Sequence, residues 1–153
     1  MCIRDSYTPI TDSTNYRNIS CHEPVYINGK EFLMTGNYTN YGFDPTDVNI
    51  YYCTEDLTDF RVVYKFGNSS RYSDPNMGNS DNEIICRHVH AITWDAYTDK
   101  FWINTGDAVI DGKNENHWMT SEYINNNWVF TVIVSGSDTS HYKDGGLYFD
   151  EDN

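Results

Sequence analysis

Two stretches of the chain share one pattern: residues 49–66 read NIYYCTEDLTDFRVVYKF, and residues 117–134 read HWMTSEYINNNWVFTVIV. Each stretch has an aromatic-rich run, a polar turn, an aromatic residue and then a β-branched run. Aromatic and β-branched residues suit the half-buried surface of a β-sheet, and the polar residues between the runs favour turns. Phe60 of the first stretch aligns with Trp128 of the second, which predicts an internal repeat of paired strands.

The repeat extends upstream of both stretches, because His22 aligns with His90 at the spacing that relates Phe60 to Trp128. Each unit is therefore predicted to form four short antiparallel strands. The predicted strands are residues 19–27, 30–35, 48–53 and 60–66 in the first unit, and 87–95, 100–105, 115–121 and 128–134 in the second. No window has a sustained helical period, so the predicted fold class is all-β.

The turn between the first two strands is marked in both units. Asn28-Gly29 is typical of a two-residue hairpin, because both residues tolerate positive φ. Residues 96–99 are its counterpart and predict a four-residue turn. Four-stranded repeating units fit the blades of a β-propeller, with a β-sandwich and a solenoid as alternative architectures.

The repeat divides the chain into segments. Residues 1–6 resemble the translated end of a sequencing adapter and are left out of the fold. The predicted organisation is a poorly defined N-terminal segment (7–18), a first blade (19–66), a surface loop (67–86), a second blade (87–134) and the start of a truncated third blade (135–153).

The turns between the third and fourth strands resemble the Asp-box hairpin, S-x-D-x-G-x-T-W. Residues 121–128, SEYINNNW, keep the serine and the tryptophan, with Tyr123 at the aspartate position and Asn125 at the glycine position. Residues 53–60, CTEDLTDF, keep an acid, Glu55, and a final aromatic residue.

With the segments RHVH (87–90) and FWINTGD (101–107), these hairpins make the chain similar to the sialidase-like Asp-box (BNR) superfamily over residues 17–150. The resemblance implies a partial β-propeller with degenerate Asp-box hairpins. It also implies a secreted or cell-surface glycoside hydrolase or polysaccharide lyase, with a carbohydrate substrate and no cofactor. The alternative is a non-catalytic propeller that binds glycan or protein and whose channel histidines are structural.

Strand pairing predicts a candidate site. Regular pairing across the 96–99 turn places His90 opposite Thr105 and His88 opposite Asp107. Histidines two residues apart share one face of a strand. The first strand of a propeller blade lines the central channel, so this cluster would lie where propeller enzymes bind their substrates.

The residue types suggest the roles. His88 and His90 suit general acid–base catalysis, with Asp107 orienting an imidazole ring. Arg87 has the planar fork that binds a carboxylate or sulfate, and Thr105 and His22 complete the predicted substrate-binding set. Two imidazoles on one strand face could share a metal ion, but with Asp107 as the single fixed acid no metal site is predicted.

The charge and the cysteines exclude other classes. The formal net charge is −13, with only 10 lysines and arginines, which argues against nucleic acid or an anionic membrane surface as partner. No apolar stretch approaches the roughly 20 residues of a membrane span, so no membrane insertion is expected. Apart from Cys2, the cysteines are Cys21, Cys53 and Cys86, without the CxxC spacing of a zinc site or the even number of a disulfide framework.

Overall fold

The computed structural model describes residues 25–38, 47–54, 60–70, 72, 74–106, 108–136 and 149. The strands are β1 (Val25–Ile27), β2 (Lys30–Gly36), β3 (Asn49–Thr54), β4 (Phe60–Lys65), β5 (His88–Asp95), β6 (Lys100–Gly106), β7 (Val109–Ile110), β8 (Lys113–Asn114), β9 (Asn116–Ile124) and β10 (Asn127–Gly136). The all-β prediction is confirmed. Within the described ranges, no helix is long and apolar enough to cross a membrane.

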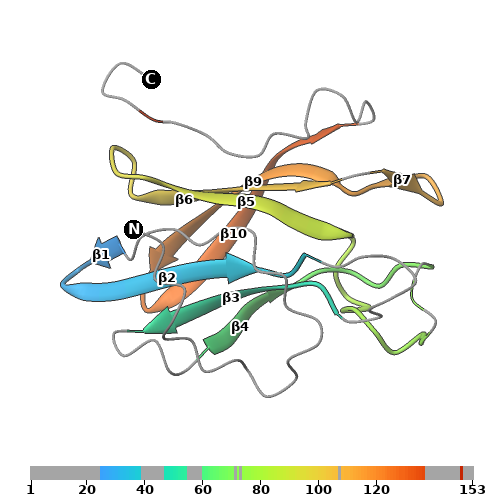
Figure 1. Ribbon diagram of the computed structural model, residues 1–153, viewed down its shortest axis with the longest axis horizontal. Helices are drawn as coiled ribbons and strands as arrows, with labels where there is room; N and C mark the ends of the chain where they lie inside the picture. Colours follow the sequence, from blue (N-terminus) through green and yellow to red (C-terminus); the bar gives the residue numbers. More distant parts are fainter. Residues whose placement is uncertain are drawn as a thin grey trace.

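The strands form two antiparallel four-stranded sheets and a short hairpin. The first sheet has the order β1-β2-β3-β4, the second has the order β10-β9-β6-β5, and β7 pairs with β8. Figure 1 shows the two larger sheets stacked face to face, with the β7–β8 hairpin extending beyond the second. The predicted strands lie within a few residues of the observed ones, except that residues 19–24 lie outside the described ranges.

Two tight turns have the backbone that their asparagines predict. Asn28-Gly29, between β1 and β2, has φ values of 51° and 75°. Asn125-Asn126, between β9 and β10, has φ values of 51° and 64°, so both residues lie in the left-handed region. Positive φ at both central residues matches the twist of the flanking strands, which explains these short connections.

The longer turn at 96–99 is held by one carboxylate. The backbone N–H groups of Tyr97 and Thr98 donate to Asp95 Oδ1 over 2.9 and 3.3 Å, and the Thr98 hydroxyl donates to Asp95 Oδ2. Burial alone would raise the pKa of Asp95, but these hydrogen bonds outweigh it and the pKa is lowered. Asp95 is therefore an ionised turn residue at the end of the β5–β6 hairpin remote from the histidines.

Apolar side chains from both sheets fill the space between them, with Met34, Ile50, Ile92, Ile103 and Met119 at its centre. Trp128 lies within this layer and meets the ring of Phe32 at 5.4 Å and that of Tyr123 at 5.0 Å between centroids. Aromatic pairs of this kind each contribute about 0.5–1.5 kcal/mol beyond their burial. Tyr123 therefore packs as an aromatic ring against the layer between the sheets.

The sheets also meet at one corner, where the chain beyond β2 runs beside the start of β5. The Val89 N–H donates to the Asn37 carbonyl over 2.9 Å, and Tyr38 forms a β-bridge with His88. Gly36 makes this approach possible, because a Cβ there would lie 2.6 Å from the Val89 Cβ. This corner positions the candidate site.

The segment that connects β4 to β5 along the chain was predicted as a surface loop, but its last residues are buried in the core. The Gly67 N–H donates to the Ile84 carbonyl over 2.7 Å, which closes the segment on itself. Ile85 and Cys86 are buried against the sheets. The loop is thereby tied to the second sheet just before β5 begins.

Candidate functional site

The pairing predicted for the histidines is wrong, because β5 contains a β-bulge. The register is regular from Asp95 to Ala91, but Val89 then pairs with Thr105, and His88 pairs with Gly106. His90 is the extra residue on β5. A bulge changes where the following side chains point and is common next to functional sites. No residue of the β5–β6 hairpin predicts this bulge from the sequence.

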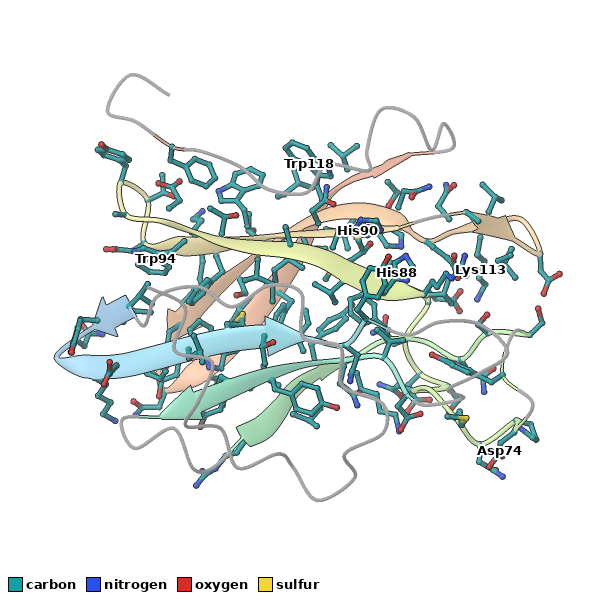
Figure 2. The ribbon with its side chains drawn as sticks, viewed as in Figure 1. Asp74, His88, His90, Trp94, Lys113 and Trp118 are labelled. Atoms are coloured by element: carbon teal, nitrogen blue, oxygen red, sulfur yellow. The ribbon has the colours of Figure 1, made fainter. Side chains whose placement is uncertain are left out.

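Despite the bulge, the imidazole rings of His88 and His90 lie together. The rings of His88 and His90 meet at 4.8 Å between centroids, with planes inclined by 68°. Tyr38 completes the group: its ring is parallel to His88 at 4.0 Å and lies edge-on to His90 at 6.0 Å. Figure 2 shows both histidines near the right-hand end of β5, remote from Trp94. We call Tyr38, His88 and His90 the ring cluster.

The members of the ring cluster differ in exposure. His88 is almost completely buried, with 2% of its surface exposed, whereas His90 is half-buried. The ring of His88 is covered by Tyr38, so His90 is the imidazole that a ligand can reach. Tyr38 carries no signal of this role in the sequence, because its position beside β5 depends on the docking of one sheet against the other.

A second feature lies beside His90, over Gly106. A Cβ at position 106 would lie 2.8 Å from His90 Nε2 and 3.0 Å from Asn116 Oδ1. Asn116, the first residue of β9, is fully buried, and neither polar atom of its amide has a hydrogen-bond partner among the described residues. We call this arrangement the Gly106 gap: two polar side chains converge where residue 106 has no side chain of its own.

Thr105 is not part of this site. Its hydroxyl donates to the Glu115 carbonyl over 2.6 Å and accepts from the His117 N–H over 3.0 Å. The residue is fully buried and fixes the chain between β8 and β9 against β6. Its predicted position opposite His90 is wrong for the same reason, the bulge in β5.

The remaining predicted residues are placed only in part. Arg87 directly precedes β5 and is half-buried. Asp107 follows Gly106 in sequence, but it lies outside the described residues, as does His22. The structure thus brings together His88 and His90 from the predicted set, and adds Tyr38 and Asn116 to them.

His117 is a buried histidine that sequence analysis did not single out. Its Nε2 lies 3.0 Å from the Ile85 carbonyl, and its Nδ1 lies 2.8 Å from the Ser135 hydroxyl. A carbonyl can only accept, so Nε2 carries the proton and Nδ1 accepts from the hydroxyl. Burial lowers the pKa of His117, and its hydrogen bonds to the backbone of Ile85 and Asn114 offset only part of that effect. The uncharged His117 side chain therefore links β9 to Ile85, in the segment that connects β4 to β5, by a hydrogen bond.

The outer face of the second sheet is aromatic. Trp102 and Trp118 alternate along their strands with the core residues Ile103 and Met119, so they lie on the face away from the first sheet. Their rings meet at 6.3 Å, and Phe149 lies 6.0 Å from Trp102. Figure 2 shows Trp118 on this side of the sheet.

The described part of the chain contains no group of three or more histidine, cysteine, aspartate or glutamate side chains arranged to hold a metal ion. The described site consists of the rings of Tyr38, His88 and His90 and the side-chain amide of Asn116. A scan against protein-family models finds no match, and searches of curated proteins and of solved structures find none either.

Proposed function

We propose that the chain is part of a sialidase-like Asp-box β-propeller that acts on glycans, with its ligand site at the ring cluster and the Gly106 gap. One observation carries the site: His90 Nε2 and the buried amide of Asn116 converge on a glycine that leaves room for both. A buried polar group without a protein partner needs an explanation, and a bound water or ion and a functional role are among those available. Other side chains of the described residues, such as Trp128 and Asn114, also have such atoms, so it is the convergence with His90 that sets Asn116 apart.

The packing supports the propeller architecture. Each sheet is an antiparallel meander of four strands in chain order, and the two sheets are stacked through an apolar layer. A third sheet stacked on the outer face would cover Trp102 and Trp118, where Phe149 already lies. A two-sheet sandwich would instead present mainly polar residues on that face.

The residue types at the site suit a glycan. Sugar ligands offer several hydroxyl groups and an apolar ring face, which amide and imidazole groups and aromatic rings respectively can bind. His90 and Tyr38 supply an imidazole and an aromatic ring at one end of β5, and the buried Asn116 amide lies behind His90. Arg87, which directly precedes His88 in sequence, would favour a glycan that carries a carboxylate or sulfate.

For catalysis by a glycoside hydrolase or polysaccharide lyase, the two histidines take unequal roles. His90 is half-buried and would exchange a proton with the substrate. His88 is sealed beneath Tyr38 and would hold His90 in place by packing. Asp107, adjacent to Gly106, remains the candidate carboxylate for orienting an imidazole.

The second candidate is a propeller that binds glycan without turning it over. The burial of His88 favours it, because an imidazole stacked on Tyr38 with 2% exposure also fits a purely structural role. Both candidates place the ligand at His90 and differ only in whether a bond is broken.

The test compares His90→Ala with Tyr97→Ala, which removes an exposed ring at the opposite end of the β5–β6 hairpin. Binding and turnover are measured on a panel of neutral, uronic-acid-containing and sialic-acid-containing oligosaccharides. If the wild type turns over a glycan and His90→Ala binds it without turnover, the enzyme is supported. Binding without turnover in the wild type, lost in His90→Ala, supports the binding protein. Failure of the folded wild type to bind any glycan rejects both.

A further inference from the structure

Asn116 is a buried amide whose role in the fold is unexplained. It is the first residue of β9, it is fully inaccessible, and both Oδ1 and Nδ2 lack a hydrogen-bond partner among the described residues. Its neighbour His117 points to the other side of β9 and has partners for both ring nitrogens. A strand position that served only packing would be occupied more favourably by an apolar side chain.

The polar side chain that shares the space around Asn116 is His90. Among the glycines that the structure describes, Gly106 is the one whose missing Cβ would meet polar side-chain atoms, His90 Nε2 at 2.8 Å and Asn116 Oδ1 at 3.0 Å. Because both atoms lie within about 3 Å of one point, a single bridging water or a small rotation of either side chain can connect them. The glycine is what permits the approach.

We propose that Asn116 is a positioning residue for His90: its Oδ1 accepts the Nε2–H of the imidazole, directly or through one water, across the Gly106 gap. The neutral ring then carries its proton on Nε2 and keeps its lone pair on Nδ1. The partner of one imidazole nitrogen determines the tautomer and hence which nitrogen can accept a proton from a ligand. This inference rests on the proposed function only in taking His90 as the ligand-contacting histidine.

His117 lies on the opposite face of β9 from Asn116 and is an internal reference for the tautomer of His90. His117 is held as the Nε2–H tautomer by the Ile85 carbonyl, independently of Asn116. A substitution at Asn116 that merely disturbed β9 would change the signals of both histidines. A substitution that removed the partner of His90 would change those of His90 alone.

The experiment is long-range ¹H–¹⁵N NMR of the imidazoles in the ligand-free chain, at a pH where they are neutral, for the wild type, Asn116→Asp and Asn116→Leu. Asn116→Asp retains an acceptor oxygen, whereas Asn116→Leu has a similar volume and none. We expect the Nε2–H tautomer of His90 in the wild type and Asn116→Asp. In Asn116→Leu, the ratio of Nε2–H to Nδ1–H should fall about five-fold, as for the loss of one hydrogen bond, with His117 unchanged.

An Nδ1–H tautomer of His90 in the wild type would overturn the inference even if the leucine variant failed to fold. An unchanged ratio in a folded Asn116→Leu would overturn it too. Glycan binding is a separate measurement. If the tautomers are as expected but no glycan binds, the proposed function is rejected and the role of Asn116 stands. If a glycan binds but His90 has the Nδ1–H tautomer, the role of Asn116 is rejected and the proposed function stands.

Discussion

The ring of Tyr38 lies parallel to the ring of His88, with the centroids 4.0 Å apart and the planes inclined by 2°. Tyr38 lies just beyond the end of β2 in the first sheet, and His88 is the first residue of β5 in the second sheet. The stacked pair therefore joins the two sheets at the candidate site. It buries His88 and leaves His90 as the accessible imidazole.

Tyr38→Ala should lower the free energy of unfolding by about 1–3 kcal/mol, because it removes both the stacked pair and the cover over His88. Urea unfolding measures the change. Tyr97→Ala is the matched control, since Tyr97 is 58% exposed, and it should change stability by less than about 0.5 kcal/mol. Equal effects of the two substitutions would show that the stack does not hold the corner together.

Gly106→Ala should destabilise the chain by about 1–3 kcal/mol and shift the imidazole signals of His90, because the new methyl group would meet His90 Nε2 at 2.8 Å and Asn116 Oδ1 at 3.0 Å. Gly112→Ala is the control, because it adds a methyl group with nothing within 4 Å and carries only the strain of a φ of 77°. It should leave the His90 signals in place. Unshifted His90 signals in Gly106→Ala would contradict the geometry of the gap.

The stability of the chain should fall as the pH drops below about 6.5, the ordinary pKa of histidine. The pKa of His117 is lowered in the folded state by burial, so below that pH the unfolded chain binds a proton that the folded chain does not. Above about pH 6.5 the histidine is neutral in both states and contributes no slope. His117→Gln should reduce the slope on the acidic side. Urea midpoints between about pH 5 and 8 test this, and an unchanged slope in the variant would assign the effect to other groups.

Asn126→Gly should stabilise the chain by about 0.5–1 kcal/mol. Asn126 has a φ of 64° at the second position of a two-residue hairpin turn, where glycine has no steric penalty. Asn126→Ala should be destabilising for the opposite reason. Thermal unfolding of the three proteins should therefore rank glycine above asparagine above alanine, and a different order would argue against this turn.

Phe149→Ala should expose Trp102 and lower stability by about 1 kcal/mol, because the two rings pack at 6.0 Å. Acrylamide quenching of tryptophan fluorescence measures the exposure. Trp102→Phe identifies the part of the signal that belongs to Trp102, and the extra quenching should vanish in the double variant. Unchanged quenching in Phe149→Ala would mean that Phe149 does not cover the outer face.

The strands could be predicted because their signals are local. Alternating aromatic and β-branched residues mark β3, β4, β9 and β10, and Asn28-Gly29 fixes the β1–β2 register. The site could be predicted only in outline. The bulge at His90 leaves no local signal, so the partners of His88 and Thr105 came out wrong.

Tyr38 and Asn116 were missed for a different reason. Tyr38 reaches His88 only because the sheets dock, and Asn116 and His90 converge only because pairing across three strands brings both of them over Gly106. Such contacts join residues far apart in the chain, and neither residue carries a motif of its own.

The most direct test of the ligand site is NMR titration of the wild-type chain with the oligosaccharide panel, following the His90 imidazole and the Asn116 side-chain amide. We predict that a bound glycan shifts both signals, while the indole N–H signal of Trp94, at the opposite end of β5, stays in place. A shift of that indole with His90 and Asn116 unmoved would place the ligand elsewhere and contradict the assignment of the site.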